Sequence, residues 1–219
     1  MTMKEAMYRR HMVRKYQDKS IPDDLNEKLS SRINENNERY GLGIRLITND
    51  GNAVSTAIKL ILTKNVKNYF VMAGPESDDL DEKLGYCGAD LMLYAQTLGL
   101  NTWWIGGTFN RKVASAAAEG NKAVGVIAVG YGETQGKPHK TKTLYEVSSY
   151  NGEMPAWFRD GVEAALLAPT ALAKQAFHIH GNGKKVRINC DNGIFSGVDT
   201  GLVKYHFELG AGNENFFWE

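Results

Sequence analysis

Basic residues near the start of the chain form the first group whose types and spacing are suited to chemistry. The segment RRHMVRKY, residues 9–16, contains Arg10, His11 and Arg14, with Met12 between them. If a helix continues through this segment, Arg10 and Arg14 share a helix face and can hold a phosphate through charge-assisted hydrogen bonds. The alternative is a solvated basic surface without a ligand.

A second basic group follows an apolar run in the later part of the chain. The loop GKPHKTKTL, residues 136–144, contains Lys140 and Lys142 beside a histidine. Because it follows a predicted buried strand, this loop can reach the same anion as the N-terminal arginines. Loop lysines are often only solvated, so this group alone leaves both interpretations open.

Two tryptophans stand next to a double glycine in LGLNTWWIGGTFN, residues 98–110. Gly106 and Gly107 allow a ligand to approach the backbone closely, and the aromatic pair that ends at Trp104, next to Ile105, offers an apolar wall. Backbone N–H groups here can donate to a heterocycle. A buried turn with aromatic core residues is the alternative.

A proline turn with small residues occupies APTALAKQAF, residues 168–177, and Gln175 precedes a predicted strand. On composition alone, this segment is an ordinary connection between a helix and a strand.

Composition and motif spacing exclude several classes of protein. The chain has 219 residues, 42% of them hydrophobic, and its net charge of +1 indicates affinity for neither nucleic acid nor an anionic membrane. Cys87 and Cys190 lie far apart without metal-ligand spacing, so we expect no metal site, a reducing compartment and a core position for Cys87. The sequence shows no membrane-length apolar run and no secretory signal, so we expect a cytoplasmic protein. The glycines also lack the GxGxxG pattern of a dinucleotide-binding helix.

The elements that must position these groups follow from periodicity and turn residues. Helices are expected over residues 2–12, after the turn at 21–24, and over 85–98, 155–167 and 199–209. Strands are expected over 44–48, 69–72, 123–132 and 176–180. Ser77 is a candidate helix cap. The helix over 85–98 is apolar on most faces and stops at Gly99, so we expect it to be buried nearly all round. The valine-rich strand over 123–132 is typical of a strand covered on both faces.

The arrangement of these elements predicts an α+β fold in which helices cover a mostly antiparallel central sheet. Similar turns after Ile47 and after His180 predict two hairpins and hint at an internal duplication. Because no linker or low-complexity segment interrupts the chain, we expect residues 1–219 to form a single domain.

Together, these motifs resemble the FMN-dependent nitroreductase family. The segment from Cys87 to Phe109 is similar to the family's long central helix and the turn that runs past the flavin ring. RRHMVRKY is similar to its RHSxRxF-like signature, which contacts the flavin phosphate and pyrimidine end. Lys140 and Lys142 fall at the positions of its phosphate-binding pair.

The sequence also departs from the family pattern. Met12 stands where the signature usually has serine. The SPSxxNxQPW-like block usually follows the N-terminal helix but here resembles only residues 168–177, close to the C-terminus. In that block Pro169 and Gln175 agree with the family, whereas Ala173 replaces the asparagine and Ala176-Phe177 replace Pro-Trp.

The resemblance implies an FMN-dependent NAD(P)H oxidoreductase that functions as a homodimer, with FMN at the subunit interface. NADH or NADPH delivers hydride to flavin N5, and a nitroaromatic, a quinone or another small acceptor then takes the electrons, with no catalytic side chain. The implied FMN-binding residues are Arg10, His11, Met12, Arg14, Trp104, Ile105, Gly106, Gly107, Lys140, Lys142, Pro169, Thr170, Ala171 and Gln175. A flavin-binding module without turnover, for storage or sensing, and a flavin reductase are the alternatives.

Overall fold

The structure is a computed structural model that describes the backbone of residues 1–219 and the side chains at every position other than 56, 57 and 60. The helices are α1 (Met3–Arg9), α2 (Asp23–Tyr40), α3 (Thr56–Leu62), α4 (Leu80–Thr97), α5 (Arg111–Ala117), α6 (Leu144–Val147), α7 (Ala156–Ala165) and α8 (Ser196–Ala211). The strands are β1 (Arg45–Ile47), β2 (Tyr69–Gly74), β3 (Asn101–Ile105), β4 (Lys122–Gly130), β5 (Ser148–Asn151), β6 (Phe177–Asn182), β7 (Lys185–Cys190) and β8 (Phe217–Trp218). Short 3₁₀ helices are η1 (Gly51–Ala53) and η2 (Ala171–Ala173).

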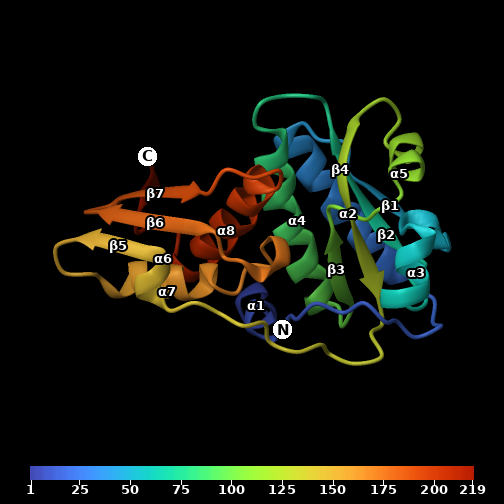
Figure 1. Cartoon of the computed structure of the whole chain (residues 1–219), viewed down its shortest axis with the longest axis horizontal. Helices are drawn as coiled ribbons and strands as arrows, with labels where there is room; N and C mark the ends of the chain where they lie inside the picture. Colours follow the sequence, from blue (N-terminus) through green and yellow to red (C-terminus); the bar gives the residue numbers. More distant parts are fainter.

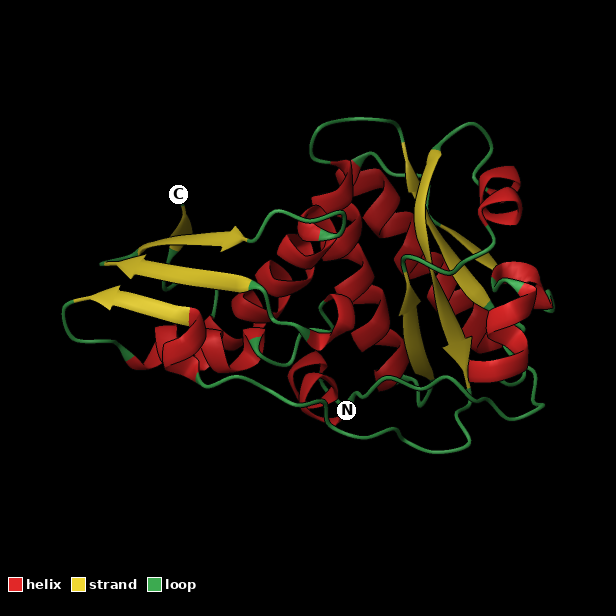
Figure 2. Ribbon diagram, viewed as in Figure 1, coloured by secondary structure: helices red, strands yellow, loops and turns green.

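The strands form two four-stranded sheets at opposite ends of the molecule, with α4 and α8 between them (Figures 1 and 2). The strand orders are β1-β2-β4-β3 in one sheet and β5-β6-β7-β8 in the other. The α+β class is therefore confirmed, but the strands are divided between two sheets instead of one central sheet.

The first sheet is antiparallel throughout and is covered on both faces. Along β2, Phe70 and Met72 face the core that contains α4, whereas Tyr69 and Val71 face a second cluster beneath α5 and η1. Alternate residues of β4 divide in the same way. Burial on both faces explains why the sequences of these strands are continuous apolar runs.

The second sheet contains the expected C-terminal hairpin. β6 and β7 pair antiparallel around a turn in which Gly183 has φ +57°, a left-handed conformation that glycine adopts without a steric penalty. β5 and β8 add to its edges in parallel. The other predicted tight hairpin, after Ile47, is wrong, because η1 and α3 lie between β1 and β2 although these two strands do pair antiparallel.

Two central helices, α4 and α8, cross at glycines. A side chain at Gly85 would meet the Val198 carbonyl oxygen, and one at Gly201 would meet the Glu82 carbonyl oxygen, so only glycine allows the backbones to approach this closely. As expected, α4 is buried on most faces, and Gly99 follows it with φ +80°. Burying each large apolar side chain here contributes about 1.5–3 kcal/mol. The helix cap is Asp79 rather than Ser77, whose Oγ instead donates to Asp79 Oδ1 at 2.8 Å.

Helix α1 is shorter than its sequence suggests. Thr2 and Glu5 form a capping box at its start, but the chain is already extended at Arg10. Backbone hydrogen bonds from Val13 N to Thr102 O (3.2 Å) and from Tyr16 N to Lys64 O (2.9 Å) hold the following segment extended. These bonds compete with helix formation, so the prediction of a helix through residue 12 is wrong.

No helix of the described part of the chain is long and apolar enough to cross a membrane. Both cysteines are free thiols. Cys87 is fully buried in the main core, and burial raises its pKa to about 12. The thiol therefore stays protonated at neutral pH, as expected of a core residue.

Candidate functional site

The N-terminal basic segment lies beside β3, the strand that contains both tryptophans of the double-tryptophan motif. Met12 bridges to Thr102 at the start of β3, and the Arg14 guanidinium lies over the Trp103 ring, 5.3 Å from its centroid. Arg10 and Arg14 therefore do not share a helix face. An extended segment places them near β3 instead.

Both arginines carry buried nitrogen atoms that the protein does not satisfy. Arg10 is only 5% exposed, and burial lowers its pKa to about 10. Among the described side chains, neither Arg10 Nε nor Arg14 Nε has a hydrogen-bond partner. Leaving a charged donor buried and unpaired is costly, so this arrangement favours an anion or a polar ring as its partner.

The basic loop meets the N-terminal segment at a cavity of about 230 Å³. Its lining includes Arg10, His11, His139 and Thr141. Burial, followed by the nearby charges of Arg10 and His139, lowers the pKa of His11. Lys140, on the same loop, is exposed. The structure thus brings together basic groups that lie more than half the chain apart in sequence.

Gln175 joins the basic loop to the block at residues 168–177. Its Nε2 donates to Leu166 O at 2.8 Å and to Thr141 Oγ1 at 3.1 Å, and its backbone N donates to Thr170 Oγ1 at 3.1 Å. It also accepts hydrogen bonds from Lys142. The role of this side chain is therefore to fix the loop against the block.

The block itself has an irregular backbone. Leu172, Ala173 and Gln175 have φ values of 55°, 53° and 48°, in the left-handed region that costs a non-glycine residue about 1–3 kcal/mol. Pro169 is partly buried and Thr170 is buried. Strained backbone of this kind persists where surrounding contacts enforce it, and it is common at ligand sites.

Asp199, in the first turn of α8, holds the block from the other side. Its Oδ1 and Oδ2 accept hydrogen bonds from Ala171 N at 2.9 and 3.2 Å. Burial raises the pKa of Asp199 to about 6, although the bond from Ala171 acts in the opposite direction. Sequence reasoning missed this residue. The available signal was an acid among the small and apolar residues of the first turns of the helix, Ser196 to Val203.

A phenylalanine packs against the double glycine. A Cβ at Gly106 would lie 2.9 Å from Phe195 Cε1, and one at Gly107 would lie 3.7 Å from Phe195 Cζ. Trp104 packs over Gly88 of α4, and Ile105 is buried. Phe195 was also missed, because nothing in the sequence pairs the turn before α8 with the end of β3.

Contacts connect the sequence-predicted residues into one series. His11 and Met12 touch Gly136, and the loop that follows Gly136 is tied through Gln175 to Thr170. The next residue, Ala171, is bonded to Asp199, one helical turn after Phe195, and Phe195 contacts Gly106. The predicted segments are therefore linked in one series of contacts, although Lys140 contacts none of them directly by a hydrogen bond.

His206 of α8 is a further buried polar group near these cations. Its Nδ1 lies 2.8 Å from Leu202 O, which makes Nδ1 the donor, and Nε2 has no partner among the described residues. Burial lowers the pKa of His206 to about 3, with smaller contributions from the charges of Arg10 and His139. The ring is therefore neutral at physiological pH. In the described part of the chain, no cluster of His, Cys, Asp and Glu side chains is arranged to hold a metal ion.

Comparison with known proteins identifies the fold and family. The sequence model of the family described as "Putative TM nitroreductase" matches residues 2–211. A "putative nitroreductase" structure from Thermotoga maritima MSB8 is 19% identical, with a TM-score of 0.67, and the match covers 96% of this chain and 83% of that chain. No curated protein matches this chain.

Two shorter structures match most of their own length but less of this chain. A "putative NADH dehydrogenase/NAD(P)H nitroreductase" from Parabacteroides distasonis ATCC 8503 is 18% identical with a TM-score of 0.54, covering 69% of this chain and 98% of that chain. A nitroreductase-like family protein from Bacillus cereus is 17% identical with a TM-score of 0.52, covering 67% and 94%. Because the family model spans nearly the whole sequence, the protein belongs to this nitroreductase family.

Proposed function

We propose that the protein is an FMN-dependent NAD(P)H oxidoreductase of the nitroreductase type, acting on a small acceptor such as a nitroaromatic compound or a quinone. The observation that carries this proposal is the buried guanidinium group of Arg10 together with the partly exposed Arg14, because the Nε atoms of both are buried and lack partners among the described residues. Family membership supports an oxidoreductase, and the arginines indicate an anionic ligand with a polar ring.

The residues present fit FMN. Arg10 and His11 line the 230 Å³ cavity, and Lys140 belongs to the loop that closes it. This set of donors suits a single terminal phosphate. Arg14, stacked over Trp103, supplies a positive charge for the pyrimidine end of the ring system. Met12 offers only its backbone, because its side chain is exposed and carries no hydrogen-bonding group.

We assign the ring system to the region where β3, the block and α8 meet. Gly106 and Gly107 lie beside Phe195, and Ala171, at the end of the Pro169–Ala171 segment, donates a backbone hydrogen bond to Asp199 of α8. In this arrangement Trp104 forms the apolar wall, whereas Ile105, the next residue of β3, faces the opposite side of the sheet, in the cluster beneath α5 and η1. Phe195 must turn away from Gly106 for a planar ring to reach this backbone, because its ring already contacts that position.

The protein's contribution to the reaction is binding, orientation and charge. Bound FMN supplies the capacity to accept a hydride from NADH or NADPH and to pass electrons to the acceptor. Arg10 and Lys140 anchor the phosphate, and Arg14 keeps a positive charge at the edge of the ring where reduction places negative charge. Gln175 fixes the loop and the block, so that both substrates meet the same rigid surface.

The first experiment tests the cofactor. Purified protein incubated with FMN and desalted should be yellow, and denaturation should release FMN and not FAD. The matched control is incubation with FAD, whose second phosphate and adenosine need room beyond the cavity at Arg10. Protein that remains colourless with FMN, or that releases FAD, would exclude the proposal.

The second experiment tests turnover. Under anaerobic conditions NADH or NADPH should bleach the bound flavin, and a nitroaromatic or a quinone should restore its colour, with ping-pong steady-state kinetics. If neither nicotinamide bleaches the flavin, the protein is a binding module without turnover. If reduced flavin leaves the protein before reoxidation, the protein is a flavin reductase.

A further inference from the structure

The second part of the chain repeats the element order of the first. A helix, an antiparallel strand pair, a long central helix and a strand occur as α2, β1 with β2, α4 and β3, with η1 and α3 inserted between β1 and β2. The same order returns as α7, β6 with β7, α8 and β8. α4 and α8 cross in the middle of the molecule (Figure 1). α4 follows β2 of the first sheet, and α8 follows β7 of the second sheet.

The helix crossing is reciprocal, as in a two-fold interface. Gly85 of α4 meets the Val198 carbonyl of α8, and Gly201 of α8 meets the Glu82 carbonyl of α4. Glu82 lies one turn before Gly85, and Val198 lies one turn before Gly201. Contacts in which each element presents the same position to the other define an isologous interface between two copies, here within one chain.

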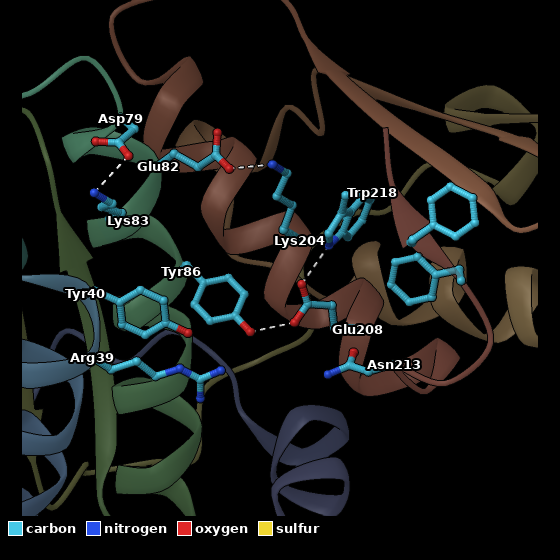
Figure 3. A pocket seen from close by; sticks show the side chains of 12 residues that line it. Arg39, Tyr40, Asp79, Glu82, Lys83, Tyr86, Lys204, Glu208, Asn213 and Trp218 are labelled. Carbon is cyan, nitrogen blue, oxygen red and sulfur yellow. Dashed lines mark hydrogen bonds and ion pairs between the residues drawn. The ribbon is translucent and has the colours of Figure 1, made fainter.

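Applied to the proposed flavin region, this correspondence leads to a second groove. The proposed region lies between the end of α7, the first turn of α8, the middle of α4 and β3. Exchanging the two halves gives the end of α2, the first turns of α4, the second half of α8 and β8. A groove of about 540 Å³ lies there, with a lining that includes Tyr40, Glu82, Glu208 and Trp218 (Figure 3).

Two of the three cations that line this counterpart groove, Lys83 and Lys204, are in ion pairs, and the third, Arg39, lies over the Tyr40 ring. Glu208 accepts hydrogen bonds from Tyr86 Oη at 2.5 Å and from Trp218 Nε1 at 2.8 Å, and Lys204 pairs with Glu82 (Figure 3). Nothing like the RRHMVRKY segment precedes α7 in the sequence. The groove therefore mixes the carboxylates of Asp79, Glu82 and Glu208 with three cations, two of which are already paired. It suits a phosphate less well than the region of Arg10 and Arg14, whose Nε atoms have no partner among the described residues.

We infer that this chain is an internal pseudo-dimer that builds one complete flavin site, in which residues 156–219 supply what a partner subunit supplies to a homodimeric site. The block at residues 168–177 and the first turn of α8 belong to this second half, and hydrogen bonds join the block to the basic loop of the same chain. One FMN then binds per chain, and a second copy of this chain does not complete the site. The inference rests on the proposed function.

A complementation experiment tests it. Arg10→Ala removes a phosphate contact from the first half, and Ala171→Trp fills the ring region from the second half. Each variant alone should lose FMN. If both parts of a site come from one chain, co-expressing the two variants restores no flavin. If the parts come from different chains, each mixed pair contains one intact site and flavin returns, up to one per pair of chains, which would overturn the inference while leaving the proposed function intact.

Stoichiometry gives an independent readout that does not depend on how well the variants fold. Native mass spectrometry of the wild-type holoprotein should show FMN retained by single chains, one for each chain, because the site needs no second copy. The groove variant Asn213→Trp, at an exposed lining position, should keep that ratio. Two FMN per chain, with one lost in Asn213→Trp, would overturn the inference. Failure of the wild-type protein to bind FMN would overturn the proposed function and this inference together.

Discussion

Lys142 N donates a 2.7 Å hydrogen bond to Gln175 Oε1, and Lys142 Nζ donates a second, of 2.9 Å, to Gln175 O. The lysine expected to bind phosphate is thus already engaged by the block. Of the two loop lysines, Lys140 is the exposed one and has the freedom to reach an anion. Lys142 therefore contributes by fixing the loop as well as by its charge.

Replacing Gln175 with alanine should loosen this connection. The change leaves Lys142 N without its partner and removes one of the two contacts of Leu166 O, which also lies 3.1 Å from His139 Nε2. A buried group left unpaired costs about 1–3 kcal/mol. We expect lower stability in urea and faster amide exchange at Lys142. Lys174→Ala, at the exposed neighbouring position, is the control and should change neither. Equal effects of the two changes would show that the Gln175 bonds do not hold the loop.

Replacing Arg10 with methionine should weaken FMN binding without lowering the stability of the apoprotein. A buried cation without a partner is often replaced by an apolar residue with neutral or stabilising effect, so the apoprotein should unfold at the same or a higher urea concentration. FMN affinity should fall by about 1.5–3 kcal/mol, the value of a lost charged hydrogen bond. Arg9→Met, at an exposed position, is the control. A variant that is destabilised yet binds FMN normally would show that Arg10 has a structural role.

Two groups near the site should make opposite contributions to stability as the pH changes. Burial lowers the pKa of His206 from 6.5 to about 3, so the unfolded chain binds more protons in that window. The contribution of His206 to the free energy of unfolding is complete above pH 6.5. It is lost as the pH falls, by up to about 1.4 kcal/mol per pH unit. Burial raises the pKa of Asp199 from 3.8 to about 6, so its contribution is present below pH 3.8 and is lost as the pH rises through 6.

Variants at these positions should expose the two opposing contributions. Asp199→Asn leaves His206 unopposed, so this variant should lose stability more steeply than the wild type between pH 6.5 and 4.5. His206→Gln should lose less than the wild type over the same range. Urea unfolding at several pH values measures both slopes, and the remaining carboxylates act equally in all three proteins. Identical slopes would show that neither group titrates with a shifted pKa.

Local sequence patterns predict much of this fold. The apolar helix through Leu84 and Leu91, the doubly covered strands and the hairpin at Gly183 follow from periodicity and turn chemistry, which depend on neighbouring residues. The end of α1 does not, because Thr102 and Lys64, the partners that hold residues 12–16 extended, are distant in sequence.

The candidate site likewise contains residues that the sequence predicts and residues that only the packing of the helices reveals. The basic and glycine-rich segments are recognisable from residue type, whereas Phe195, Asp199 and His206 come together with them only when α8 packs against α4. The pairing of Gln175 with Lys142 likewise depends on the path of a long loop. Residue types therefore identified the segments of the candidate site, and packing between the two halves identified the residues that hold these segments in place.

The glycine crossing of α4 and α8 provides the sharpest test of the central packing. A Cβ at Gly201 would meet the Glu82 carbonyl and lie 2.5 Å from Tyr86 N, both backbone atoms that cannot rotate away. Gly201→Ala should therefore destabilise the protein by about 1–3 kcal/mol or more, and Gly85→Ala should do the same through the Val198 carbonyl. Gly193→Ala is the matched control, because no atom lies within 4 Å of its added Cβ.

Once one substitution has pushed the helices apart, the second should cost less, so the double variant should lose less stability than the two single losses combined. Urea unfolding of the wild type and the four variants measures these differences. Strictly additive losses, or a Gly201→Ala protein as stable as Gly193→Ala, would show that the helices do not approach each other as closely as the structure indicates.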